Sequence, residues 1–238
     1  MKAIILAAGK STRLHPLTLD KPKCLLELEE GMAIIDHQIN TLRETGLEEI
    51  IVITGHNSDK IHSHLGDSVE YRFFPDFAKY NNMHTLHSIK EDLNDDVVIM
   101  YSDVLFGKDL LEKCIQSKDD FSLLVHNKEV LKDTARVKMK ADSVVDIGNH
   151  IPVAEGHGNF IGIAKYSKHG INLLLQEIEK RISDPRYNND YYIIPLIELA
   201  KSNKIGYELA NNSPWIEMDF EADYIKAKNE IYPLIKNQ

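Results

Sequence analysis

Three short and almost entirely apolar runs constrain the fold of this chain most strongly. They are KAIILA at residues 2–7, EIIVIT at residues 49–54 and VVIMY at residues 97–101. A strand that is apolar at nearly every position is buried on both faces, as in a parallel sheet with helices on either side. Helical patterns at residues 32–45 and 83–93 fall between these runs. We therefore predict repeated β-α units around a mostly parallel sheet.

The second half of the chain has a different pattern. Residues 136–140 alternate between apolar and polar side chains, and residues 143–147 can complete a hairpin with them. The sequence predicts further strands at 69–74, 121–126, 160–166, 205–209 and 215–218, and further helices at 110–115, 170–182, 191–202 and from 221 onward. No linker, repeat or low-complexity tract interrupts the chain, so we predict a single domain over residues 1–238. The expected fold class is α/β: a three-layer α/β/α sandwich with a mostly parallel mixed sheet, Rossmann-like, and a small strand-rich lobe.

A loop with the sequence LAAGKSTRL, residues 6–14, follows the first predicted strand. Loops at this end of an open parallel sheet form the ligand site. The loop is not a P-loop, because Ile4 stands where that pattern needs its first glycine. It is not a Rossmann dinucleotide loop, because Ser11 and Leu14 stand where the second and third glycines belong. A different kind of phosphate-binding loop is therefore expected.

The charge of the chain is unevenly distributed. The formal net charge is −9 over 238 residues, which argues against a general nucleic-acid binder. Residues 1–23 nevertheless hold five basic residues and one acidic residue, a net of +4, so the rest of the chain carries −13. A small basic region in an acidic protein suits a nucleotide better than a long polyanion.

Acidic and basic residues stand near the predicted carboxyl ends of strands. Asp103 follows the third apolar run, Asp219 follows the last predicted strand, and the opening segment supplies Lys23 and Arg13. Carboxylate and phosphate oxygens are the ligands that Mg²⁺ prefers, so the combination suggests a nucleotide with a divalent ion. Each residue also has a simpler explanation, since Asp103 could be a turn residue and Asp219 a helix cap. Lys23 could be a surface lysine and Arg13 could pair with Asp20, so only the joint arrangement favours a site.

The cysteines and the N-terminal segment bear on the compartment. Cys24 and Cys114 have no C-x-x-C spacing and are expected to be buried free thiols in a reducing environment. The apolar stretch at the start is too short for a signal peptide, and no run approaches the length of a membrane span. We therefore predict a cytoplasmic protein that contacts neither membrane nor nucleic acid.

Several segments, in order along nearly the whole chain, resemble a known enzyme family. They are LAAGKSTRLHPLTLDKPKCLLEL, EIIVITG, Tyr80-Asn81-Asn82, YSDVLF, FIGIAKYS and WIEMD. These segments are similar to nucleotidyltransferases that activate sugar phosphates, phosphocholine or phosphonates. The Asn81-Asn82 pair and WIEMD look most like the small CTP-dependent cytidylyltransferases of the phosphocholine and 2-aminoethylphosphonate type. The chain departs from the pattern at Ser11, where the family usually has glycine, and at Asn159, where an acidic residue is frequent.

The resemblance implies a reaction between CTP and a small acceptor that carries a phosphate or phosphonate. An acceptor oxygen would attack the α-phosphorus of CTP, with Mg²⁺ as cofactor, and pyrophosphate would leave. The acceptor oxygen is already an anion, so the work is positional and electrostatic and needs no general base. Two alternatives remain open: a sugar-1-phosphate nucleotidyltransferase that uses UTP, dTTP or GTP, and a non-catalytic nucleotide sensor. The oligomeric state is not determined by the sequence, with a homodimer as the candidate assembly.

The resemblance also implies roles for residues near the nucleotide. Lys10 and Arg13 would bind the β- and γ-phosphates, and Lys23 would bridge the α-phosphate and the acceptor. The expected catalytic residues are Lys23, Arg13, Asp103 and Asp219, with Asp103 and Asp219 as metal ligands. The expected nucleotide-binding residues are Leu6, Ala7, Ala8, Gly9, Lys10, Ser11, Thr12, Arg13, Lys23, Asn82, Thr85 and Ser102. For Asn82, the capping of a helix is an equally good explanation.

The acceptor is expected to bind in the second half of the chain. Residues 1–130 would mainly bind the nucleotide, while residues 131–238 would mainly bind the acceptor and supply the second metal carboxylate. The expected acceptor-binding residues are Glu155, Asn159, Asp190, Tyr192, Trp215 and Glu217. The rings of Tyr191, Tyr192 and Trp215, with a carboxylate, could receive a choline-like cation. Ordinary packing is the more frequent role of such rings, because large aromatic residues are mostly buried.

Overall fold

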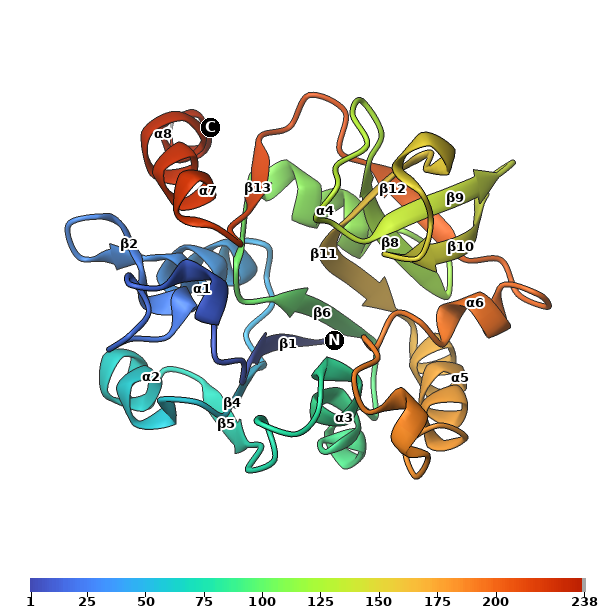
Figure 1. Ribbon diagram of the computed structural model, residues 1–238, viewed down its shortest axis with the longest axis horizontal. Coiled ribbons are helices and arrows are strands. Elements are labelled where there is room, and N and C mark those ends of the chain that lie inside the picture. The colour runs from blue at the N-terminus through green and yellow to red at the C-terminus, as the bar shows by residue number, and fades with distance from the viewer. Residues whose placement is uncertain (237–238) are drawn as a thin grey trace.

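The computed structural model describes residues 1–236 and is built around a nine-stranded mixed sheet (Figure 1). The three apolar runs form the neighbouring strands β1 (Lys2–Ala7), β4 (Ile50–Thr54) and β6 (Val97–Tyr101), and β5 (Glu70–Phe73) lies beyond β4. All three pairings, β6 with β1, β1 with β4 and β4 with β5, are parallel. The prediction of a mostly parallel sheet in an α/β fold is confirmed for this half of the chain.

The second half adds strands of both directions to the same sheet. β11 (Gly158–Tyr166) runs antiparallel to both β6 and β8 (Phe121–His126). The predicted hairpin is present as β9 (Arg136–Lys140) and β10 (Ser143–Gly148), and β9 pairs with β11. β12 (Gly206–Leu209) is parallel to β8. The central strand β11 therefore joins the two halves into one continuous sheet.

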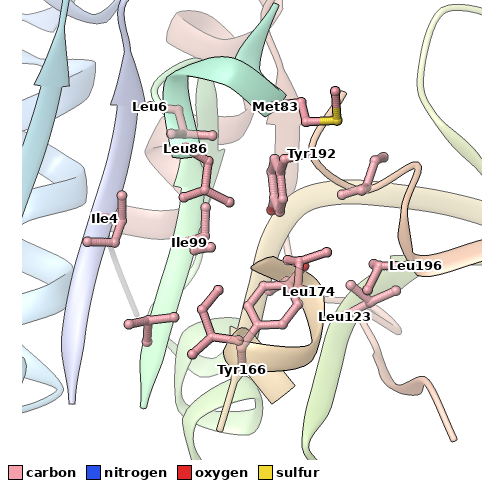
Figure 2. Close-up of a cluster of buried hydrophobic side chains, with 14 of the residues drawn as sticks. Ile4, Leu6, Met83, Leu86, Ile99, Leu123, Tyr166, Leu174, Tyr192 and Leu196 are labelled. Atoms are coloured by element: carbon pink, nitrogen blue, oxygen red, sulfur yellow. The ribbon is translucent and has the colours of Figure 1, made fainter. Parts of the chain in front are cut away.

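Helices cover both faces of the sheet, because successive side chains of a strand point to opposite sides. Ile4 and Leu6 of β1 share one apolar cluster with side chains of α3 (Asn82–His87) and α5 (Lys168–Glu179), shown in Figure 2. Ala3 and Ile5 of β1 pack instead with α1 (Ile34–Glu44) and α4 (Lys108–Gln116). The arrangement is the predicted three-layer sandwich.

Several local predictions were wrong or incomplete. The helix expected at 191–202 is reduced to α6 (Leu196–Leu199), because Pro195 has no backbone N–H to donate and is tolerated at the start of a helix but not inside it. The helix expected at 83–93 ends at His87, and a short 3₁₀ turn follows at Lys90–Asp92. The helix expected at 32–45 begins at Ile34, because Met32–Ala33 form the short strand β3. No prediction covered α2 (Ser58–Leu65), or the short strands β2 (Glu27–Glu29) and β7 (Val104–Phe106).

The C-terminal segment returns to the start of the chain. β13 (Trp215–Glu217) pairs antiparallel with β7, just after the end of β6. The helical turns that follow are α7 (Glu221–Lys226), a π-helical segment (Ala227–Ile231) and α8 (Tyr232–Lys236). They pack on a third apolar cluster that includes Leu14 and Met218. Among the described residues, no helix has the length and apolar character needed to cross a membrane.

Candidate active site

The carboxyl ends of β1 and β6 open into a cavity of about 340 Å³. Ligands bind at such strand ends in open α/β sheets. All twelve residues expected to bind the nucleotide line this cavity, as do Asp103, Glu217 and Asp219. The predicted residues therefore lie around one cavity, and their roles in binding and catalysis remain predictions.

The loop after β1 offers unpaired backbone donors to this cavity. Within residues 1–236, the backbone N–H groups of residues 9–13 donate to no protein acceptor. Ser11 has a left-handed backbone conformation, with φ 54° and ψ 35°. Successive N–H groups around a left-handed residue form a concave anion site, or nest. A Cβ built on Gly9 would meet nothing within 4 Å, so the space above this residue is open.

Lys23 lies among carboxylates that come from distant parts of the chain. Its Nζ is 2.5 Å from Asp103 Oδ2 and 3.2 Å from Asp219 Oδ1. The guanidinium of Arg13 is 2.7 Å from the same Asp219 oxygen. Glu217 completes the group, and one oxygen from each of the three carboxylates lies within 4.8 Å of the others. The pairing of β13 with β7 places these carboxylates together, since Glu217 is opposite Val104.

The electrostatic balance of this group is visible in its pKa values. Burial raises the pKa of Glu217 well above its ordinary value, and the charges of Asp103 and Asp219 raise it further. Burial also raises the pKa of Asp219, although Lys23 opposes that shift. Burial lowers the pKa of Lys23, but Asp103 and Asp219 together outweigh it and leave the pKa above its ordinary value. Lys23 is therefore a charged ammonium among carboxylates that repel one another.

Asp103 does lie in a turn, between β6 and β7, but the simpler explanations for Asp219, Arg13 and Lys23 do not hold in the structure. Asp219 does not cap α7, because Asp223 Oδ2 accepts the N–H groups of Asp219 and Phe220 at 3.1 and 2.8 Å. Arg13 pairs with Asp219 and not with Asp20. Lys23 is buried, with 11% of its side chain exposed. The joint arrangement that the sequence suggested is present in space.

Asn82 does not cap its helix. The cap of α3 is Asn81, whose side-chain oxygen accepts the N–H of Asn82. Asn82 Oδ1 instead accepts the N–H of Tyr192 at 2.8 Å. The backbone N–H and the Nδ2 of Asn81 donate to the carbonyls of Asn188 and Asn189. The asparagine pair therefore anchors the segment 188–192 to the nucleotide side of the cavity.

The far end of the cavity is lined by residues that the sequence did not single out as acceptor-binding. They are Asp133, Ala135, Asn149 and Phe160, and Tyr191, which was among the expected aromatic candidates, lines the same cavity. Three of them flank the β9–β10 hairpin, which is the only sequence signal that could have indicated them. Tyr101 at the end of β6 also lines the cavity, and its ring meets that of Phe160 edge-on at 5.9 Å between centroids.

The six residues expected to bind the acceptor are dispersed. Glu217 lines the cavity, and Trp215 lines a neighbouring cavity of about 550 Å³ that shares Glu217 and Asp219 with it. Tyr192 is completely buried in the core, and the side chain of Glu155 pairs with Lys138. Neither these two nor Asp190 lines either cavity.

Asn159 is also absent from both cavity linings, but it supports a loop that borders them. It is completely buried, and its Oδ1 accepts the N–H of Leu131 at 2.8 Å. Its Nδ2 donates to the carbonyl of Glu129 at 2.6 Å. Asn159 therefore holds the loop that carries Asp133.

Comparisons with known proteins agree with this geometry. The family described as Nucleotidyl transferase matches residues 2–135. A CTP:phosphoglutamine cytidylyltransferase of Campylobacter jejuni is 28% identical over 250 aligned residues, covering 94% of this chain and 97% of the relative. A UTP–glucose-1-phosphate uridylyltransferase of Haloferax volcanii is 34% identical over 125 residues, half of each chain. The structure of a CTP:phosphocholine cytidylyltransferase from Streptococcus pneumoniae superposes with a TM-score of 0.80 at 25% identity, covering 95% of this chain and 97% of that one.

Proposed function

Because the chain belongs to the nucleotidyl transferase family, we propose that this enzyme is a Mg²⁺-dependent cytidylyltransferase for a small phosphate- or phosphonate-bearing acceptor. The observation that carries the proposal is one cavity that combines a loop of free N–H groups with Lys23 inside a carboxylate cluster. The first feature suits a triphosphate, and the second suits the phosphorus at which two anions must meet. Similarity to two cytidylyltransferases over nearly the full chain supports CTP as the donor.

The carboxylate cluster fits a divalent ion. Asp103, Glu217 and Asp219 offer hard oxygen ligands within 4.8 Å of one another. Asp103 Oδ1 is buried and has no hydrogen-bond partner among the described residues, so one ligand atom is available. Asp103 and Asp219 would hold the ion, with Glu217 as a third candidate. When bound, the ion would neutralise phosphate charge at the reacting centre.

The protein's own residues account for positioning and charge stabilisation. The N–H groups of residues 9–13 would hold the triphosphate, with Lys10 and Arg13 at its outer phosphates. An acceptor oxygen forms a bond to the α-phosphorus while the bond to the bridging oxygen of pyrophosphate breaks, and pyrophosphate leaves with that electron pair. Lys23 would contact both the α-phosphate and the acceptor phosphate. It thereby offsets the repulsion between the two anions and the charge that develops in the transition state.

The far end of the cavity indicates the kind of acceptor. Its side chains include one carboxylate, Asp133, one amide, Asn149, and the rings of Phe160 and Tyr191. The three basic residues of the lining, Lys10, Arg13 and Lys23, all come from the N-terminal segment. A head group that is neutral or positively charged suits this end, since aromatic faces and a carboxylate attract cations. The acceptor phosphate would then point towards Lys23.

A sugar-1-phosphate nucleotidyltransferase is the second candidate, favoured by the similarity of half the chain to the uridylyltransferase. The two candidates differ in the nucleotide. The test is pyrophosphate release from each of the four common NTPs, with phosphocholine, 2-aminoethylphosphonate, a phosphorylated amide and glucose 1-phosphate as acceptors. Preference for CTP with a non-sugar acceptor supports the proposal. Turnover of UTP or dTTP with glucose 1-phosphate at least as fast as any CTP reaction overturns it in favour of the second candidate.

A further inference from the structure

Thr18 makes a buried contact with the phosphate loop that the reaction outlined above does not use. Its residue surface is 1% exposed, and its Oγ1 donates a hydrogen bond of 2.7 Å to the backbone carbonyl of Ser11. The two residues are seven positions apart, so the contact closes the segment between them into a compact loop. No other side chain donates to a carbonyl of residues 9–13 in the part of the chain that the structure describes.

Ser11 is the residue of this loop that most needs support. Its φ of 54° lies in the left-handed region, which an L-residue with a side chain disfavours and glycine does not. Its own side chain makes no capping hydrogen bond to the 3₁₀ turn at Thr12–Leu14. The Ser11 carbonyl instead accepts two hydrogen bonds, one from the N–H of Leu14 at 3.2 Å and one from Thr18 Oγ1.

The orientation of this carbonyl determines the direction of a donor in the cavity. In a trans peptide the C=O of one residue and the N–H of the next point in opposite directions. A Ser11 carbonyl that is held towards Thr18 therefore directs the N–H of Thr12 away from Thr18. The same peptide begins the turn that carries Arg13, whose guanidinium reaches Asp219 at 2.7 Å.

We propose that Thr18 is a positioning residue for nucleotide binding: its hydroxyl holds Ser11 in the left-handed conformation and so keeps the phosphate loop in its binding shape. This inference rests on the proposed function only in taking the ligand to be a triphosphate. The hydroxyl acts on the loop before any ligand arrives, which reduces the ordering that binding would otherwise require. Loss of the Thr18 hydroxyl therefore lowers the affinity for the nucleotide and leaves the acceptor site unchanged.

The test compares Thr18→Val, which keeps the shape of the side chain, with Thr18→Ser, which keeps the hydroxyl. The net free energy of one such hydrogen bond, converted to an equilibrium constant, corresponds to a change in affinity of roughly three- to tenfold. We expect Thr18→Val to weaken the binding of CTP and of inorganic tripolyphosphate, measured by calorimetry, by about that factor. The KM for the acceptor should not change. Thr18→Ser should bind as the wild type does.

A second substitution tests whether Thr18 acts through Ser11. If it does, Thr18→Val should cost less in a Ser11→Gly background, because glycine adopts the left-handed conformation without support. The matched control is Thr41→Val, which removes another buried hydroxyl, bonded to the carbonyl of His37 on α1, away from the cavity. It should leave the affinity for CTP unchanged.

Three outcomes would overturn the inference. The first is Thr18→Val binding CTP and tripolyphosphate like the wild type. The second is a loss of affinity from Thr18→Val that is equally large in the wild-type and Ser11→Gly backgrounds. The third is a loss of affinity from Thr18→Ser as large as that from Thr18→Val. Either of these means that the hydroxyl does not act by holding Ser11. A wild-type protein that binds tripolyphosphate and all four NTPs equally would contradict the choice of CTP alone. The role of Thr18 would then still be decided by the tripolyphosphate measurements.

Discussion

The two ends of the active-site cavity are constructed in different ways. The end to which we assign the nucleotide is formed largely by one uninterrupted segment, residues 6–13, and its free donors include the backbone N–H groups of residues 9–13. The end to which we assign the acceptor is formed by single side chains from the residues that flank the β9–β10 hairpin, from β11 and from the segment that Asn81 and Asn82 anchor. A backbone site depends on the conformation of one loop, whereas a side-chain site depends on how several elements pack. The first kind can be identified in a sequence, and the second cannot.

Lys23 lies where the two ends meet, so its replacement should have the largest effect. Lys23→Met should reduce turnover about 10²- to 10³-fold, as the loss of one preorganised charge typically does. Without a metal it should also lower the melting temperature, because Asp103 and Asp219 lose their shared cation. Pyrophosphate release and thermal denaturation in EDTA measure the two effects.

Lys10→Met provides the control for Lys23, because Lys10 is exposed and lines the same cavity. Its loss should leave the backbone donors in place and cost less than tenfold in turnover, with no change in melting temperature.

Added Mg²⁺ should raise the melting temperature of Lys23→Met more than that of the wild type, since a divalent cation can compensate the charge of the carboxylates. Turnover of Lys23→Met within a few-fold of wild type would contradict the role given to this residue.

The carboxylates on either side of Lys23 should act as one unit. Asp103→Asn, Asp219→Asn and the double variant should be similarly inactive, because residues that serve one function do not contribute additively. The measurement is pyrophosphate release over a range of Mg²⁺ concentrations. Losses that multiply in the double variant would mean that only one of the two belongs to the metal site.

Asn82 connects the two ends, and its replacement should affect the acceptor more than the nucleotide. Asn82→Ala leaves the Tyr192 N–H without its acceptor and should loosen the segment that carries Tyr191. We expect the KM for the acceptor to rise by about threefold to tenfold, the factor that corresponds to one such hydrogen bond. The ratio of kcat/KM for CTP and UTP should change little, because the amide oxygen already binds the Tyr192 N–H.

Steady-state kinetics with each substrate varied would check this expectation. Asn82→Asp keeps an oxygen at the same position and should retain more of the acceptor affinity than Asn82→Ala does. A collapse of CTP selectivity in Asn82→Ala would instead assign base recognition to this side chain.

Glycines near the nucleotide loop should give the smallest effects and separate binding from folding. Gly9→Ala places a methyl group in open space, so the melting temperature should stay within a few degrees of wild type while the KM for CTP rises a few-fold. Gly55→Ala would place its Cβ 2.7 Å from the carbonyl oxygen of Ala8, and overpacking of this kind typically costs about 1–3 kcal/mol. Circular dichroism melts and CTP kinetics distinguish the two. Equal melting temperatures for both variants would contradict the packing argument.

The fold could be predicted where the pattern of apolar and polar residues within a single strand or helix was enough to identify it. The buried strands β1, β4 and β6 were evident because each is apolar on both faces. The β9–β10 hairpin was evident because its first strand alternates. The helix expected at 191–202 is shortened to Leu196–Leu199, because Pro195 and the hydrogen bond of Asn82 with the Tyr192 N–H impose turns on the residues before it. Short strands such as β7 carry too few residues for any periodic signal and exist through their pairing with β13.

The sequence by itself determined the sheet of the first half, and it indicated the loop after β1 and the charged residues Arg13, Asp103 and Asp219 that the structure gathers around Lys23. These features depend on short-range patterns: apolar runs, the composition of one loop and polar residues directly after strands. Only the tertiary structure decided that Glu217 joins Asp103 and Asp219, that Tyr192 lies in the core while Tyr191 lines the cavity, and that Asn82 anchors a segment 110 residues away. The physical reason is that neighbours in space are set by the pairing of strands and the packing of helices, and a single sequence does not contain those distances.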